Sequence, residues 1–317
     1  MRNQERYKEL CGRESSIPIF SQAWWLDAVA EKQWDVVIIS KNGQIEATLP
    51  YTLRKKYGFN ILSQPQLTQN LGPWIRSTNI KYTKQLAREK ALMNALICQL
   101  PDYASFSQNW SPNITNWLPF YWKGFEQTTR YTYRLKNIDE LDLIWQSFRE
   151  NIRRDIRKAE KREGLIVRSD ACVTDFLKLN EKVFLRQGKS LPYTRAFVER
   201  IDKAASQKQA RKIFIAEDSQ GRQHAGVYII WDSNSAYYLM GGGDPELRNS
   251  GATSLCMWEA IKYSSKVTEC FDFEGSMIEE VERFFRAFGA TQTPYNHVSH
   301  TPSRLAKTLK FIRSIKG

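Results

Sequence analysis

The sequence predicts an α/β protein of two similar domains in tandem, each a mixed, mostly antiparallel sheet flanked by helices. The first observation is length, because 317 residues exceed what one hydrophobic core usually fills. The second is the element order of the second half, β-α-α-β-β-β-α-β-α-β, which follows from hydrophobic periodicity and turn residues. The third is that the first half repeats most of this order, as expected of a duplicated fold.

In the second half, apolar residues at helical spacing over 141–159 predict a helix that ends at Gly164, where a left-handed residue is expected. Thr194 is expected to cap another helix, because its hydroxyl accepts a backbone N–H. Two polar segments, Asp218-Ser-Gln-Gly221 and Asp232-Ser-Asn-Ser235, are typical of turns between strands. The remaining elements are strands at 165–167, 213–217, 225–231, 236–240, 270–273 and 291–297, and helices at 175–187, 194–205, 251–264 and 278–288.

The first half contains the same kinds of element in a similar order. Strands are expected at 35–40, 46–53, 59–62, 104–108 and 127–135, and helices at 23–31, 82–99 and 114–122. A local echo supports duplication, since Phe120-Tyr-Trp-Lys-Gly-Phe-Glu-Gln-Thr-Thr129 matches Phe284-Phe-Arg-Ala-Phe-Gly-Ala-Thr-Gln-Thr293 in its aromatic residues and glycine. A chance similarity of short aromatic strings is the alternative, and the shared element order favours duplication.

We place the domains at residues 1–138 and 139–302, followed by a basic amphipathic helix at 303–317. That last segment carries five Lys and Arg residues and no acid. Its apolar residues share one helical face: Leu305, Leu309, Ile312 and Ile315. Docking on a neighbouring domain is the commoner role of such a helix, and contact with an anionic membrane surface is the alternative.

Composition limits the class of protein. The formal net charge of +13 favours anionic partners, namely phosphates, nucleic acid or a membrane surface, without choosing among them. No apolar run reaches the ~18–20 residues of a membrane span, and the first ten residues lack the apolar core of a secretory signal. Three His and five scattered Cys give no metal or disulfide spacing. We therefore expect a soluble cytoplasmic protein without a metal, with the inner face of the membrane as an alternative location.

Four segments carry a resemblance to a known family. They are Asn151-Ile-Arg-Arg-Asp-Ile-Arg-Lys-Ala-Glu-Lys161, Arg248-Asn-Ser-Gly-Ala-Thr253, Phe271-Asp-Phe-Glu-Gly-Ser276 and Phe284-Phe-Arg-Ala-Phe-Gly-Ala290. With the element order, they resemble the GNAT acyltransferase superfamily, and the tandem arrangement resembles its FemAB-like branch. Relatives in that branch include aminoacyl-tRNA-dependent enzymes that build peptidoglycan cross-bridges and acyl-CoA-type acetyltransferases. The resemblance implies two GNAT-like domains, the first degenerate, and transfer of an acyl group onto an amine.

The segment from Met240 to Thr253 is rich in glycine and leads into a helix. Glycines let a ligand approach the backbone, and free amides at a helix N-terminus bind phosphate. The resemblance implies that this Gly-rich loop holds the pyrophosphate of an acyl-CoA, although Thr253 stands where the family has Gly or Ala. An ordinary turn and helix start is the alternative. The residues assigned to the donor are Met240, Gly241, Gly242, Arg248, Ser250, Gly251 and Ala252.

Asp272 and Glu274 alternate with two Phe residues in a predicted strand, which would place both carboxylates on one face. Attack by an amine requires a base, and a partly buried carboxylate is a suitable one. We take Glu274 as the candidate base and Asp272 as the second. The alternative is that both are salt-bridged structural acids at a sheet edge, which fits Asp272 better than Glu274. The family's catalytic Tyr in the following helix is replaced by Phe285, so Tyr237, Tyr238 or the substrate itself must supply that proton.

The helix at 151–161 is expected to expose a basic flank, because Ile152 and Ile156 face a core. We assign Arg154, Arg157 and Lys158 to substrate binding, either of a phosphate-bearing acceptor or of an RNA backbone. A solvated helix with internal charge pairs is the alternative. Lys189 and Tyr193, in a segment that resembles the family's acceptor loop, complete the substrate residues.

The sequence thus predicts an N-acyltransferase. The donor is acetyl-CoA or another acyl-CoA-type thioester, and the acceptor is an amine of a cell-envelope precursor or amino sugar. An aminoacyl-tRNA-dependent transferase acting on a peptidoglycan precursor, and a non-catalytic binding module, are the alternatives. The absence of the long helical arm found in some aminoacyl-transferring relatives favours the thioester.

Overall fold

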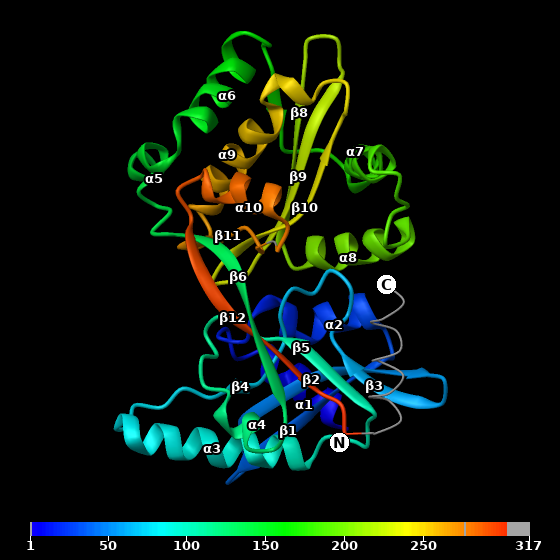
Figure 1. The fold of residues 1–317 in the computed structure, drawn as a ribbon, viewed down its shortest axis with the longest axis vertical. Coiled ribbons are helices and arrows are strands. Elements are labelled where there is room, and N and C mark those ends of the chain that lie inside the picture. Colours follow the sequence, from blue (N-terminus) through cyan, green and yellow to red (C-terminus); the bar gives the residue numbers. More distant parts are fainter. Residues whose placement is uncertain (1, 276, 303–317) are drawn as a thin grey trace. The chain divides into compact units, whose positions relative to one another are not determined.

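Figure 1 shows the computed structural model of the chain, which describes residues 2–275 and 277–302. These residues form two compact units. The first contains residues up to Arg130 together with those from Pro294 onward, and the second is Tyr131–Thr293. Both boundaries fall inside strands, whereas the sequence analysis assigned all of 139–302 to one domain. The helix expected at 303–317 lies outside the described residues.

The first unit is a sheet with strand order β1-β2-β3-β5-β12, with β4 paired to β2. Only its β3–β5 pair is parallel among the pairs that the structure describes. The strands are β1 (Trp34–Lys41), β2 (Gln44–Lys56), β3 (Phe59–Ser63), β4 (Trp74–Ile75), β5 (Ser105–Asn109) and β12 (Thr291–His300). The helices are α1 (Asn3–Cys11), the 3-10 turn η1 (Ile19–Ser21), α2 (Ala23–Ala30), α3 (Tyr82–Cys98) and α4 (Leu118–Tyr121).

The second unit has strand order β6-β11-β10-β9-β8-β7, in which only the β10–β11 pair is parallel among those described. The strands are β6 (Glu126–Lys136), β7 (Ile166–Arg168), β8 (Arg211–Glu217), β9 (Gln223–Trp231), β10 (Ala236–Gly243) and β11 (Cys270–Asp272). The helices are α5 (Leu141–Ser147), α6 (Glu150–Lys161), α7 (Val173–Arg186), α8 (Arg195–Gln207), the 3-10 turn η2 (Arg248–Ser250), α9 (Ala252–Ser264) and α10 (Glu279–Arg286). The mixed, mostly antiparallel α/β fold is confirmed.

The two units repeat one arrangement. In each, three antiparallel strands and then a parallel one form the sheet, β1-β2-β3-β5 in the first and β8-β9-β10-β11 in the second. The echoed strings are equivalent turns, since Gly124 (φ +82°) and Gly289 (φ +73°) both link a short helix to a strand. The closing strands are exchanged: β6, which ends the first repeat, pairs with β11, and β12, which ends the second, pairs with β5.

Several sequence predictions need correction. The helix expected over 141–163 is two helices, because Phe148 and Arg149 are extended (ψ 137° and 151°) and the Arg149 N–H bonds the Ala287 carbonyl instead. Phe148 is thereby buried against Trp258 and Phe288. The helix expected at 114–122 is only α4, and α1 was not expected. Gly164 (φ +62°) and the Thr194 cap, which accepts the Phe197 N–H at 3.2 Å, are as predicted.

Candidate active site

The site is organised by strand β10, which separates from its parallel neighbour β11. The two strands pair only at Ala236–Phe271 and Tyr237–Asp272. Between Tyr238 and Met240 the register with β9 shifts, so Leu239 is the extra residue of a bulge. Beyond the bulge β10 continues to Gly243, while β11 has already ended at Asp272. This edge of β10 therefore has no partner strand on the β11 side among the described residues, and an extended ligand can lie along it.

The three consecutive glycines end β10 and are not the loop that the sequence analysis expected. A Cβ on Gly241 would lie 1.8 Å from the Tyr238 hydroxyl oxygen, and one on Gly242 would lie 2.7 Å from the Asn180 backbone nitrogen in α7. Gly251, left-handed at φ +82°, begins α9, and its Cβ would lie 2.2 Å from the Asp155 carbonyl oxygen in α6. These glycines are thus required for close packing of helices and side chains within the second unit.

The other donor residues differ in what they offer a ligand. Met240 and Ala252 are buried in the core, so only their backbone is available. The buried Ser250 hydroxyl accepts the Ala252 N–H at 3.4 Å, which orders the start of α9. Arg248 is exposed in η2, and no bond from its side chain to another described residue is present. Arg248 is therefore the free cation of this segment.

Glu274 is buried, with 7% of its surface exposed, and has a left-handed backbone at φ +60°. This conformation is costly for a residue with a side chain, by about 1–2 kcal/mol. The next residue, Gly275, is also left-handed (φ +56°), and a Cβ there would lie 2.1 Å from the Tyr131 carbonyl oxygen. Strained residues that the surrounding structure holds in place are concentrated at functional sites.

Asp272 holds this turn in place. Its Oδ1 accepts the Glu274 N–H at 2.8 Å and also accepts a hydrogen bond from the Thr132 hydroxyl, and its Oδ2 lies 3.3 Å from Nε of Arg134. Burial raises the pKa of Asp272, while Arg134 and the Thr132 hydroxyl act in the opposite direction. The expected single face for both carboxylates is therefore wrong, because the strand ends at Asp272. Asp272 is a positioning residue, and Glu274 reaches different neighbours.

Tyr238 lies close enough to Glu274 for the charge of the carboxylate to act on the phenol. Burial raises its pKa, and the charges of Cys256 and Glu274 add to this effect, so the phenol keeps its proton at neutral pH. Its ring lies 5.8 Å from that of Phe285, the residue that replaces the family's Tyr. Tyr237 lies in different surroundings, with Asp232 and Asp272 as its charged neighbours. Of the two candidate acids, Tyr238 is therefore the one beside Glu274.

A buried amide, which the sequence analysis missed, connects residues 188–193, the predicted acceptor loop, to β10. Asn180 in α7 is 3% exposed; its Nδ2 donates to the Gly241 carbonyl at 2.6 Å, and its Oδ1 accepts from the Tyr193 hydroxyl at 2.8 Å. Burial raises the pKa of Tyr193 to about 12. A polar residue on the buried face of an amphipathic helix was the available signal. The exposed Lys189 forms no such link.

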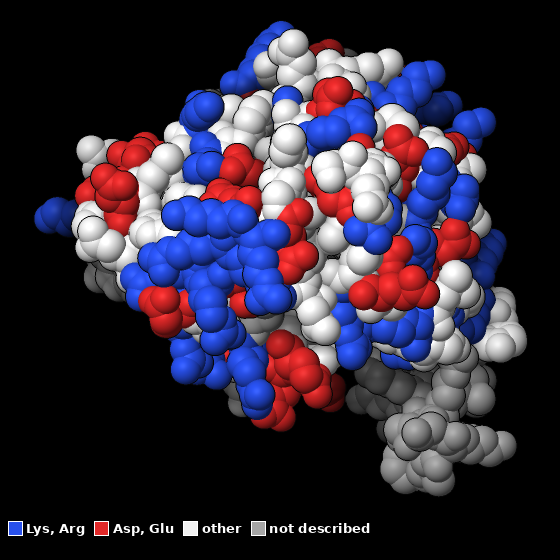
Figure 2. Space-filling view, turned by 90° about the horizontal axis from the view of Figure 1, so that it is seen from above, with Lys and Arg blue, Asp and Glu red and all other residues white. Residues whose placement is uncertain are grey.

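The predicted basic helix adjoins the donor segment. Lys158 donates to the Asn249 carbonyl at 2.5 Å, so α6 is fastened to η2. Arg157 lies 3.3 Å from Glu150, and Arg154 lies 3.7 Å from Asp155, which leaves both only partly neutralised at the surface. Helix α6 lies near the top of Figure 1, and Figure 2 shows the molecule from that side. Basic side chains gather on this face, with acidic ones at the border. The structure therefore places Lys158 beside the predicted donor segment.

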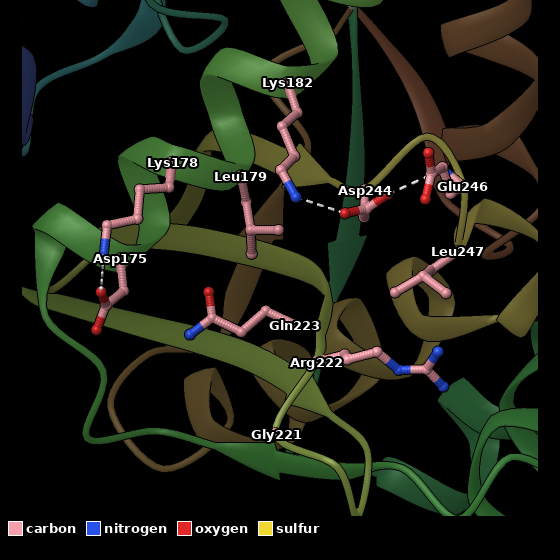
Figure 3. A pocket seen from close by; sticks show the side chains of 10 residues that line it. All are labelled: Asp175, Lys178, Leu179, Lys182, Gly221, Arg222, Gln223, Asp244, Glu246 and Leu247. Carbon is pink, nitrogen blue, oxygen red and sulfur yellow. Dashed lines mark hydrogen bonds and ion pairs between the residues drawn. The ribbon is translucent and has the colours of Figure 1, made fainter.

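A pocket of about 470 Å³ lies between α7, the β8–β9 turn and the end of β10 (Figure 3). Charged groups of both signs line it, with Lys182 bonded to Asp244 at 2.5 Å and Lys178 bonded to Asp175 at 2.9 Å. None of the predicted site residues lines it, although Leu247 on its wall directly precedes Arg248.

Residues 2–275 and 277–302 contain no group of three or more His, Cys, Asp or Glu side chains placed to hold a metal ion. In the same part of the chain, every helix is too short or too polar to cross a bilayer.

Comparison with known proteins agrees with this geometry. Residues 146–288 match the family model described as an acetyltransferase (GNAT) domain. A solved structure of FemX is similar at 13% identity and a TM-score of 0.68, covering 92% of this chain and 95% of that one. The C-terminal domain of a putative lysylphosphatidylglycerol synthetase from Agrobacterium fabrum is similar at 12% identity and a TM-score of 0.57, covering 97% and 95%. L-PGS from Bacillus licheniformis is similar at 10% identity and a TM-score of 0.55, covering 98% and 96%.

No curated protein sequence matches the chain. At these identities the solved structures establish the fold, and the family model establishes the class. The diverging strands β10 and β11 and the matching segment lie in the same unit. Residues 146–288 therefore form a GNAT acyltransferase domain.

Proposed function

We propose that the second unit transfers an acyl group from an acyl-CoA-type thioester to an amine of a cell-envelope precursor or amino sugar. The observation that carries this proposal is the open edge of β10 beside the buried pair Tyr238 and Glu274. Backbone amides along that edge suit an extended, amide-containing donor arm. Arg248 and the start of α9 suit its phosphates.

In this proposal the amine attacks the thioester carbonyl, and Glu274 removes the proton that the nitrogen must lose. The tetrahedral intermediate then collapses: the C–S bond breaks as the amide forms, and Tyr238 gives its proton to the leaving sulfur. The proton taken up by Glu274 is returned to Tyr238 directly or through water, which restores both groups. Asn180 and Tyr193 hold the acceptor loop against β10.

An aminoacyl-tRNA is the second candidate donor, and the α6 surface favours it. The side chains of Lys161 and Arg162 form no ion pair with a described residue, and Arg248 adds a third free cation in η2, to which α6 is fastened. Such a surface suits an RNA backbone. The likeness to FemX, and to synthetases named for a lysyl-bearing phospholipid, supports both this donor and a cell-envelope acceptor.

A binding experiment separates the two donors. Wild-type protein is titrated with CoA, acetyl-CoA and bulk tRNA while Tm and affinity are measured. The thioester proposal expects stabilisation by CoA compounds that Arg248→Glu weakens by about tenfold or more. The tRNA proposal expects salt-dependent binding that Arg154→Glu with Arg157→Glu weakens.

The matched control is Lys203→Glu with Lys208→Glu, two exposed cations on and just after α8. Stabilisation by tRNA alone would overturn the thioester donor. Equal losses in the control and the test variants would show a non-specific charge effect and would overturn the α6 assignment. Absence of binding to every donor would overturn the enzymatic proposal.

A further inference from the structure

The N-terminal half of α3 continues an apolar face beyond the core. Met93 and Leu96 are buried, whereas Tyr82 and Leu86 are 71% and 36% exposed. These four residues are spaced so that they lie on one side of the helix. The stripe that anchors α3 to the sheet is therefore uncovered over its first two turns.

The adjoining α4 adds three exposed apolar side chains. Leu118, Tyr121 and Trp122 are 49%, 58% and 54% exposed. Helix α4 packs against α3, as Figure 1 shows, and Nζ of Lys90 lies 4.8 Å from the centre of the Trp122 ring. We refer to Tyr82, Leu86, Leu118, Tyr121 and Trp122 as the α3–α4 patch.

The charges around the α3–α4 patch are mostly positive. Lys81, Lys84, Lys90 and Lys123 belong to or adjoin its two helices, and none of the four forms an ion pair with a described residue. The acid in these segments, Glu89, accepts hydrogen bonds from Gln85 and Asn116 at 2.9 Å each. The surroundings of the patch therefore carry a net positive charge.

We propose that the α3–α4 patch is a contact surface for a membrane that contains anionic phospholipids. Trp and Tyr prefer the boundary between headgroups and acyl chains, where the ring is in contact with carbon and its polar atom with water. Lysines near an anionic bilayer are attracted to its surface, and their stems cover apolar area while their charge stays in water. A protein partner fits less well, because lysine is depleted at the centres of protein interfaces, whereas Lys90 lies directly over Trp122.

This surface is independent of the donor and acceptor assignments in the second unit. It is also separate from the basic segment 303–317, for which the sequence analysis weighed a membrane contact. The proposal gives the first unit a role that needs no catalytic residues: it brings the enzyme to a membrane surface.

Vesicle flotation of the full chain tests the proposal. The probes are phosphatidylcholine vesicles with and without about one third phosphatidylglycerol, at low and high salt. We expect binding to the anionic vesicles that weakens with salt. Tyr121→Ser with Trp122→Ser, and separately Lys90→Glu with Lys123→Glu, are expected to reduce the partition coefficient by about tenfold each.

The matched control is Ile166→Ser with Leu185→Ser, which removes two apolar residues of the second unit that are more exposed (72% and 64%) than Tyr121 and Trp122. Two results would overturn the proposal. One is that this control also loses binding, and the other is that binding is lost only when Lys307 and Lys310 are changed to Glu. A dimer that Trp122→Ser converts to monomer without any vesicle binding would also overturn it, since the patch would then be covered by a second copy. Circular dichroism and Tm confirm that each variant is folded before it is compared.

Discussion

The Oδ1 atom of Asp272 accepts the backbone N–H of Glu274 at 2.8 Å, across a turn in which Glu274 is left-handed. The first carboxylate therefore fixes the direction of the second. This hydrogen bond stabilises the left-handed backbone of Glu274, which is otherwise unfavourable for a residue with a side chain. Two acids that alternate in the sequence thus differ in their structural roles, because Asp272 holds the turn on which Glu274 lies.

Glu274→Gln tests the candidate base. The amide keeps the shape of the side chain but cannot take a proton from the amine, so we expect turnover to fall by about 10²–10⁴-fold with donor affinity and Tm near wild type. Glu282→Gln is the control, since Glu282 bonds Tyr133 and Arg286 instead. Full turnover with a lowered Tm would show that Glu274 is structural.

Tyr238→Phe tests the candidate acid, and Tyr237→Phe is its neighbour control. Removing the Tyr238 hydroxyl takes away the proton offered to the leaving group, so we expect a loss of about 10²-fold in turnover. The loss should be smaller for a donor whose leaving group needs no proton. Equal activity of the two variants would contradict the assignment, and the proton would then have to come from the substrate.

Asn180→Ala and Tyr193→Phe test the link between the acceptor loop and β10. The first leaves the Gly241 carbonyl without its Asn180 partner, and we expect a loss of about 1–3 kcal/mol in the free energy of unfolding. The second removes only the outer hydrogen bond, with a loss of about 1 kcal/mol. Both should raise KM for the acceptor and leave donor affinity unchanged. Unchanged acceptor KM in both variants would show that the link only stabilises the fold.

Gly251→Ala tests the packing of α6 on the start of α9. The new Cβ would lie 2.2 Å from the Asp155 carbonyl oxygen at a backbone angle that disfavours side chains, so we expect a loss of about 1–3 kcal/mol in unfolding free energy. Gly243→Ala is the control, because its Cβ meets only the His224 carbonyl oxygen at 3.6 Å. A wild-type Tm for Gly251→Ala would contradict this account and would make the glycine a requirement of the ligand.

The stability of the protein should depend on pH through Asp272. Burial raises its pKa above the ordinary value of 3.8, so the native state holds the proton more tightly than the unfolded chain. This contribution favours folding below about pH 4 and is lost as pH rises through the native pKa. Asp272→Asn cannot titrate, so the wild type should lose unfolding free energy relative to the variant over that range. Urea unfolding at a series of pH values measures this, and a difference that stays constant would contradict it.

The periodic parts of the fold could be predicted from sequence, because burial repeats at fixed intervals in helices and strands. The interruption at Phe148 and Arg149 could not, since it depends on a hydrogen bond to Ala287, more than a hundred residues away. The same limit applies to the three glycines after Met240. Their composition suggests a loop, whereas their pairing with Val227, Gly226 and Ala225 of β9 makes them the end of strand β10.

The candidate site was predictable as a set of residue types but not as an arrangement. Glu274 was identified as an acid that alternates with Phe271 and Phe273. Its left-handed backbone, next to a Gly275 that lies against Tyr131, could not be read from that pattern. Asn180 resembles any polar residue in a helix until its partners, Gly241 and Tyr193, are placed around it. The structural roles of Glu274 and Asn180 depend on contacts between residues distant in sequence, which a local sequence pattern does not reveal.

The pairing of β12 with β5 sets an order for folding during synthesis. Asn109 leaves the ribosome early, while its partner His297 appears only after almost the whole second unit has been made. At ordinary elongation rates this delay is on the order of ten seconds or more. During that time the edge of β5 has no partner, and an unpaired edge invites association with other chains. The first unit should therefore need a chaperone until β12 has been synthesised. A fragment that ends at residue 138 should aggregate when expressed alone.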